Sequence, residues 1–151
     1  MGDIYWNEKK IFTVIPCDYK INTQVLYVDV NAGPNSLKFQ GAGISDGYGL
    51  TIDNVKLIRD GDTTNIVING GFSQASLSCT NSQIFNNIDG WRGRGFEVGR
   101  NRIFNWFWGI DNVVDLDGHE NAYLTQTWMF DSNYNLVQSR TFKVSLNYAC
   151  K

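Results

Sequence analysis

The chain has 151 residues and a formal net charge of -2, and 42% of its residues are hydrophobic. This length and hydrophobic content suit one domain with a substantial core, while the weak net charge excludes a general electrostatic attraction to nucleic acid or anionic membranes. The sequence contains no apolar run long enough for a transmembrane helix, so we expect no membrane insertion.

The first part of the chain predicts short strands separated by turn residues. Ile11–Ile15, Thr23–Val30 and Ser36–Gln40 are β-branched or alternating runs. Leu50–Ile58 is a fourth run, and the alternation of its apolar residues breaks at Asp53-Asn54, which predicts a β-bulge there. The residues expected in the core are Leu37, Phe39, Leu50, Ile52, Val55 and Leu57. In Thr23–Val30, one face carries Val25, Tyr27 and Asp29 and the other carries Leu26, Val28 and Val30.

The second part continues in the same manner, with an irregular loop that contains short pairing expected at Ser73–Asn87 and no helix longer than two turns. Further strands are expected at Gly95–Val98, Ile103–Ile110, Asn112–Leu116, Ala122–Met129 and Gln138–Ala149. About eight to ten short antiparallel strands with frequent turns predict an all-β fold, either a β-sandwich or a jelly roll.

Two segments of the sequence occur in the reverse of the order that a β-sandwich module would have. Gly41–Leu57 is typical of the end of a β-sandwich module, and Ile66–Phe72 is typical of its start. We therefore predict a single β-sandwich unit built from two blocks, a closing half at 1–58 and an opening half at 65–151, joined by a polar linker at 59–64. The halves can pair within one chain, as in a circularly permuted domain, or with the halves of neighbouring copies, as in a head-to-tail filament.

Placing 65–151 before 1–58 produces a more familiar order of motifs. These are Ile66-Val-Ile-Asn-Gly-Gly-Phe72, Ile88-Asp-Gly-Trp91, Val113-Val-Asp-Leu-Asp-Gly-His119, Ala122-Tyr-Leu-Thr-Gln-Thr127, Phe142-Lys-Val-Ser-Leu-Asn-Tyr148 and Ser45-Asp-Gly-Tyr-Gly-Leu-Thr-Ile-Asp-Asn-Val55. In this circularly shifted order the chain resembles the DUF642 family and its bacterial relatives, which are extracellular modules with a galactose-binding-like β-sandwich. The resemblance implies secretion, a cell-wall or matrix location and noncatalytic carbohydrate binding.

The same resemblance implies a structural Ca²⁺ near the pairing of the first and last strands. Asp53 matches a position that often supplies a carboxylate to this metal, but Ser73 stands where the family usually has Glu. Because Ca²⁺ requires six to eight oxygen ligands, we favour the alternative that Asp53 and Asn54 form hydrogen bonds within the bulge. We expect no required cofactor.

Two groups of side chains are candidates for a ligand or an interface. Trp106 and Trp108 share one strand face, where they can stack on a sugar or else belong to the core or a subunit interface. The second group is a cluster of arginines that can bind an acidic polysaccharide or the carboxylates of a neighbouring copy, or can remain a solvated rim. Its members are Arg92, Arg94, Arg100 and Arg102.

The sequence offers little that points to catalysis. The turn that holds Asp115, Asp117, His119 and Glu120 could bind a metal or act as a general acid, but exposed polar turn chemistry is the interpretation that we favour. No nucleophile elbow, phosphate-binding loop or zinc spacing occurs, so we expect no enzyme. The chain has three cysteines, Cys17, Cys79 and Cys150. They are compatible with one disulfide and a free thiol, with a bond between chains, or with three free thiols.

Two functional hypotheses follow. The first is a noncatalytic extracellular structural or adhesive protein whose partner is itself, through assembly into filaments. The alternative is a monomeric carbohydrate-binding module of a cell-wall or matrix protein, which binds a polysaccharide. An export signal is not visible at Met1–Trp6, and we expect no nucleic-acid partner.

Overall fold

The computed structural model of the chain describes residues 1–15, 20–44, 49–77, 81–100, 112–118, 120–132 and 140–150, with the exception of the Cys150 side chain. These residues form ten strands and no helix, and thus no helix long and apolar enough to cross a membrane. The strands are β1 (Gly2–Trp6), β2 (Lys9–Val14), β3 (Asn22–Asp29), β4 (Gly33–Gly41), β5 (Leu50–Arg59), β6 (Ser82–Ile88), β7 (Trp91–Arg100), β8 (Asn112–Asp115), β9 (Tyr123–Phe130) and β10 (Thr141–Cys150).

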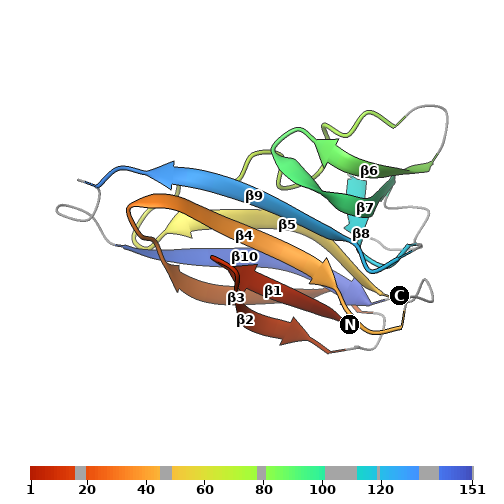
Figure 1. Ribbon diagram of the computed structural model, residues 1–151, viewed down its shortest axis with the longest axis horizontal. Coiled ribbons are helices and arrows are strands. Elements are labelled where there is room, and N and C mark those ends of the chain that lie inside the picture. Colours follow the sequence, from red (N-terminus) through yellow and green to blue (C-terminus); the bar gives the residue numbers. More distant parts are fainter. Residues whose placement is uncertain are drawn as a thin grey trace.

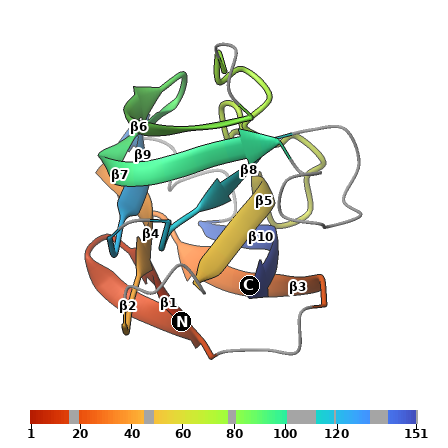
Figure 2. The same cartoon turned by 90° about the vertical axis from the view of Figure 1, so that its right-hand side faces the viewer.

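All pairings are antiparallel, and the strands follow the order β2-β1-β4-β9-β7-β8-β5-β10-β3 in one curled sheet, with β6 beside β7. The curl produces two layers (Figures 1 and 2). Layer A contains β2, β1, β4 and β9, and layer B contains β8, β5, β10 and β3. The all-β fold of the β-sandwich or jelly-roll type that the sequence predicts is therefore confirmed.

Strand β7 joins the two layers at one side of the sandwich. Its first part pairs with β9 through Arg92–Arg94, and its last part pairs with β8 through Glu97–Arg100. Between them Gly95 has a φ of 65°, a conformation that glycine adopts without steric cost. Viewed end on, β7 crosses from one layer to the other (Figure 2). Gly95 thus lets one strand turn the corner of the sandwich.

The core lies between the layers and follows the alternation of apolar residues. The predicted core positions are buried. In Thr23–Val30 the face of Leu26, Val28 and Val30 points inward, with Leu26 half-buried and the other two buried. Aromatic side chains fill the end of the core under β7, where Trp91 packs against Phe39 and Phe72 with ring centroids 6.1 and 5.6 Å apart. Large buried aromatic rings contribute strongly to core stability.

The predicted bulge in β5 is present. The register of β5 against β10 shifts where Asp53 pairs with Asn147 and Lys56 pairs with Ser145. Asn54 has a φ of 51° and is exposed, while Asp53 and Val55 are both buried. An extra residue in one strand produces this arrangement.

The two sequence blocks interleave within the sheet. Strand β5 of the first block lies between β8 and β10 of the second, and β10 in turn lies between β5 and β3. The linker lies at the end of the molecule opposite the start of β1 (Figure 1), where Asp60 N–H donates to the Thr141 carbonyl.

One segment differs from its expected structure. The Ile66–Phe72 segment, expected to open a β-sandwich half, contains turns and no strand. It depends on a distant partner, because Ile68 N–H donates a hydrogen bond to the side chain of Gln126 in β9. The short pairing expected within Ser73–Asn87 is present, since β6 forms there and pairs with β7, the next strand in the chain.

Candidate functional site

The outer face of layer A carries a continuous row of polar and aromatic side chains across five strands. Cross-strand pairing places Tyr5, Lys38, Thr125, Arg92 and Asn87 side by side, in that order. Lys38 Nζ lies 4.5 Å from the centroid of the Tyr5 ring. Paired residues of neighbouring strands point to the same face, so this row forms a single surface.

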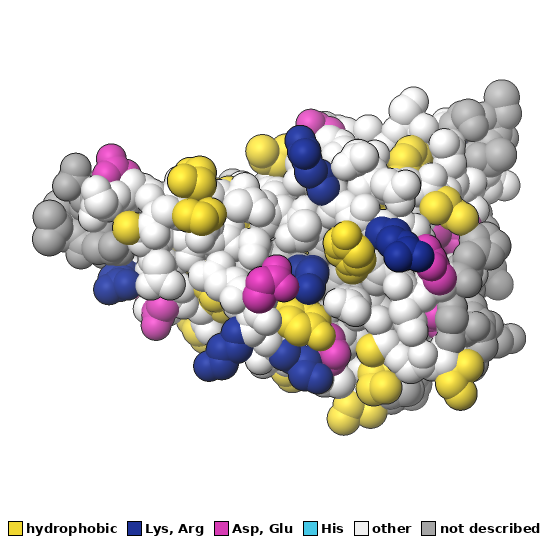
Figure 3. Space-filling model, in the orientation of Figure 1, with side chains coloured by type: hydrophobic (Ala, Val, Ile, Leu, Met, Phe, Trp, Pro, Cys, Tyr) yellow, Lys and Arg dark blue, Asp and Glu magenta, His cyan; other side chains and the backbone are white. Residues whose placement is uncertain are grey.

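A second row runs beside the first. It places Asp3, Gln40, Tyr123 and Arg94 on four adjacent strands. Tyr123 is 37% exposed, and Arg94 pairs with Glu120 at 3.1 Å in a solvent-exposed ion pair. Figure 3 shows basic, acidic and hydrophobic side chains interspersed over this face, without a broad patch of one charge.

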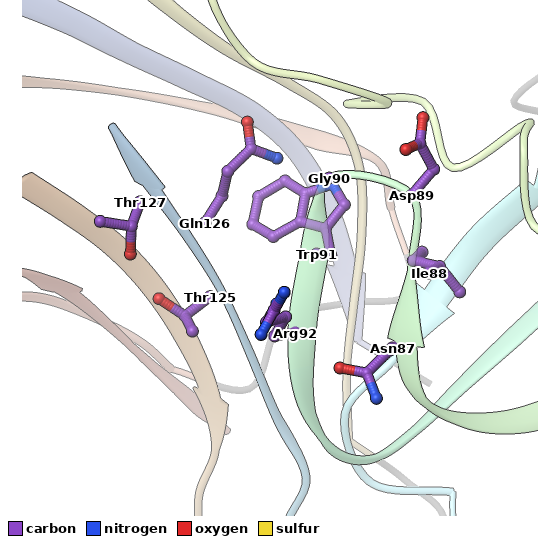
Figure 4. Close-up of a pocket in the computed structure, with 9 residues that line it drawn as sticks. All are labelled: Asn87, Ile88, Asp89, Gly90, Trp91, Arg92, Thr125, Gln126 and Thr127. Carbon is purple, nitrogen blue, oxygen red and sulfur yellow. The ribbon is translucent and has the colours of Figure 1, made fainter. Parts of the chain in front are cut away.

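A polar hollow opens where β9 leaves β7. Strands β7 and β9 pair over only three residues, and beyond this point the β6–β7 turn and β9 diverge around a hollow of about 610 Å³. Figure 4 shows its lining, which consists of Asn87, Ile88, Asp89, Gly90, Trp91, Arg92, Thr125, Gln126 and Thr127. We refer to this feature as the β7–β9 hollow.

The side chain of Gln126 provides the 66–72 segment with backbone hydrogen bonds of the kind that a neighbouring strand would make. Its side-chain amide accepts a hydrogen bond from Ile68 N–H at 2.8 Å and donates one to the Ile68 carbonyl at 2.9 Å. The side chain thus replaces a neighbouring strand for the 66–72 segment. Two indole groups add to this support: Trp128 Nε1 donates to the Ile66 carbonyl and Trp91 Nε1 to the Asn69 carbonyl.

Two charged side chains of this surface, Asp3 and Arg92, differ in their interactions with neighbouring residues. Burial acts to raise the pKa of Asp3, but hydrogen bonds from Thr13, Lys10 and Tyr5, together with the positive charge of Lys10, lower this pKa below its usual value. Arg92 is exposed and forms no ion pair among the described residues. Its guanidinium is therefore available to a carboxylate or hydroxyl group of a ligand.

The structure brings together only part of the predicted arginine cluster. Arg92 and Arg94 lie on the outer face of layer A, each opposite a residue of β9. Arg100 lies beyond the Gly95 corner and lines a separate small hollow with residues of the 73–77 segment. Arg102, Trp106 and Trp108 lie outside the described residues.

Asp53, the predicted Ca²⁺ ligand, is 6% exposed, and its Oδ1 accepts a hydrogen bond from Asn54 N–H at 2.6 Å. This hydrogen bond belongs to the bulge, as the alternative interpretation expects. In the part of the chain that the structure describes, no three His, Cys, Asp or Glu side chains gather as a metal-binding group.

The acidic turn after β8 differs from the exposed turn that we expected. Asp115 is fully buried and Asp117 is 3% exposed, and the Asp117 side chain packs directly against Gly49. Glu120 is exposed and pairs with Arg94, and His119 lies outside the described residues, as do Cys17, Cys79 and the Cys150 side chain.

Sequence reasoning missed Tyr5, Lys38, Thr125 and Asn87. The first three lie at outward positions of alternating strands, and that alternation is visible in the sequence. Asn87 follows a register shift in β6, where the sequence shows no alternation. The common row of the four residues depends on the register of strands that are distant in the chain. Comparisons with protein-family models, curated proteins and solved structures found no match.

Proposed function

We propose that this chain is a noncatalytic glycan-binding β-sandwich protein that works outside the cell and binds its ligand on the outer face of layer A. The observation that carries this proposal is the β7–β9 hollow and its continuation into the two rows of polar and aromatic side chains. The volume of the β7–β9 hollow lies within the range of small-molecule binding sites.

The chemistry of this surface suits sugars. Hydroxyl, amide and guanidinium groups from Thr125, Thr127, Asn87 and Arg92 line the hollow, and they can donate to and accept from sugar hydroxyl groups. The exposed ring of Tyr123 lies in the adjacent row, where its apolar face can cover the C–H face of a sugar. Trp91 is fully buried, so it acts as a core residue.

The resemblance to the DUF642 family, seen in the sequence motifs, agrees with this proposal in location and ligand class. It also agrees with the absence of a catalytic role. The proposed location outside the cell rests on that resemblance, whereas the proposed ligand binding rests on the surface of layer A.

Titration of the purified protein with neutral and uronate-containing oligosaccharides, by calorimetry, tests the proposal. We expect Arg92→Ala to weaken binding at least about tenfold, the loss of about 1.4 kcal/mol of ligand contact. Arg100→Ala is the matched control, since Arg100 is an exposed arginine of the same strand that lines a different hollow. The proposal is refuted if no glycan binds, or if both variants lose affinity equally.

A second candidate function, self-assembly through exchange of the two blocks, is favoured by their interleaving. Strands of the second block are inserted between strands of the first, so an exchanged block would make the same pairings with a neighbouring copy. The 60–65 segment is exposed throughout, so its backbone can rearrange without loss of core contacts.

Deletion of residues 61–63 tests this second candidate. The shorter connection cannot make the turn in which Asp62 N–H donates to the Arg59 carbonyl, which favours exchange between copies over pairing in one chain. We expect light scattering to show larger assemblies of the deletion variant, and a monomer for the control with alanines at 61–63. A monomeric deletion variant that remains folded at high concentration contradicts the candidate.

A further inference from the structure

A buried row of oxygen-bearing side chains lies on the outer face of layer B, the face opposite to the one on which the neighbouring pair Ile52 and Val114 faces the core. Cross-strand pairing places Thr51 opposite Asp115, and Asp115 opposite Glu97. Neighbours in such a row have Cβ atoms about 5 Å apart and point to the same face. Thr51 and Asp115 are both fully buried.

Asp117 extends this row by one position. It follows Asp115 by two residues, and its backbone N–H donates to Asp115 Oδ1 at 2.9 Å. Its side chain packs directly against Gly49, the residue before β5, so closely that no Cβ fits at Gly49. The carboxylate of Asp117 is therefore held in place against the start of β5, beside Thr51.

Within the described part of the chain, Thr51 Oγ1 and Asp117 Oδ1 are buried without a hydrogen-bond partner, and their side chains are 0% and 3% exposed. Neither Asp117 nor Glu97 forms an ion pair with any described residue. A buried carboxylate without a compensating charge is unfavourable, and unsatisfied polar atoms are rare enough in folded proteins to require an explanation.

We propose that this row binds a divalent cation, with Ca²⁺ the best match. The Asp117 and Asp115 carboxylates would supply the charge and Thr51 Oγ1 a neutral oxygen, and the remaining ligands would be backbone carbonyls or water. Ca²⁺ accepts such mixed oxygen ligands. The site differs from the one implied for Asp53, because the Asp53 carboxylate accepts a hydrogen bond within the bulge.

The proposal predicts that one substitution has opposite effects with and without the cation. Asp117→Asn removes the uncompensated charge, so in EDTA we expect its melting temperature to exceed that of the wild type. In CaCl₂ we expect the melting temperature of the wild type to rise and that of the variant to remain unchanged. At a cation concentration about a hundredfold above Kd, we expect the wild-type Tm to rise by about 5–10 °C.

Thermal unfolding of the full chain in EDTA, CaCl₂ and MgCl₂ tests this expectation, together with calorimetric titration of Ca²⁺. Asp60→Asn, at an exposed aspartate of the linker, is the matched control and should respond to Ca²⁺ as the wild type does. Thr51→Val is the second variant. It should fold at least as stably in EDTA and bind Ca²⁺ at least about tenfold more weakly.

The proposal is overturned if the wild type shows the same melting temperature in EDTA and CaCl₂ and no heat of Ca²⁺ binding. It is also overturned if Thr51→Val and Asp117→Asn retain the full wild-type response to Ca²⁺.

Discussion

Replacement of Gln126 by alanine should destabilise the protein through the 66–72 segment. The side chain is 4% exposed and makes two hydrogen bonds, of 2.8 and 2.9 Å, to the backbone of Ile68. Each such bond contributes about 0.5–1.5 kcal/mol, and removal of one partner leaves a backbone group unsatisfied. We expect a loss of about 2–3 kcal/mol in the free energy of unfolding, or about 4–12 °C in Tm for a chain of this size.

Urea unfolding followed by tryptophan fluorescence measures this loss, with Thr127→Ala as the control. Thr127 is exposed on the same strand, so its replacement should change stability by less than about 0.5 kcal/mol. A loss in Gln126→Ala that is no larger than in this control refutes the reasoning.

The variant Gln126→Glu tests the same two hydrogen bonds through the pH dependence of the protein's stability. A protonated glutamic acid can accept from Ile68 N–H and donate to the Ile68 carbonyl, whereas the ionised form faces that carbonyl without a proton. The folded-state pKa of the new carboxyl should therefore lie above its unfolded value of about 4.3. Stability is then fully present below pH 4.3 and lost as the pH rises through the folded-state pKa. A variant without this additional pH dependence contradicts the geometry.

Three further predictions concern other positions. Trp91→Phe retains an aromatic ring but loses the indole hydrogen bond to the Asn69 carbonyl, so we expect a loss of about 1–3 kcal/mol in urea unfolding. Gly95→Ala places a side chain at a φ of 65° and should cost at least about 1 kcal/mol, and an unchanged urea midpoint would show that the corner does not need glycine. Because the pKa of Asp3 is lowered, its contribution to stability is present above its unfolded pKa and is lost as the pH falls through the folded value. Thr13→Val should raise the Asp3 pKa measured by NMR, and an unchanged value would contradict the role of the Thr13 hydrogen bond.

Local pattern was sufficient to predict much of the fold. Alternation in Thr23–Val30 placed Val25 and Tyr27 on one face and Val28 on the other, and the structure exposes the first two and buries the third. The break in alternation at Asp53-Asn54 predicted the bulge that β5 contains. These features depend on which side of a strand faces the core, and that choice is recorded in neighbouring residues.

The candidate site was harder to predict because its residues meet only through pairing. Arg92 and Arg100 were expected together because they are close in sequence, but the turn at Gly95 separates them. The Asp115 and Asp117 pair was expected in an exposed turn because aspartate and glycine favour turns. Both side chains are instead buried in layer B, a property that depends on what packs over them.

The sequence by itself determined the class of fold, the positions of most strands and the side of each strand that enters the core, because alternation and turn residues act over a few positions. Only the tertiary structure decided that the two blocks interleave, that Gln126 replaces a strand, and that Thr51, Asp115 and Asp117 form one row. The physical reason is that these features depend on register between strands far apart in the chain. Many registers are compatible with the same alternation, and the packing of the whole core selects one of them.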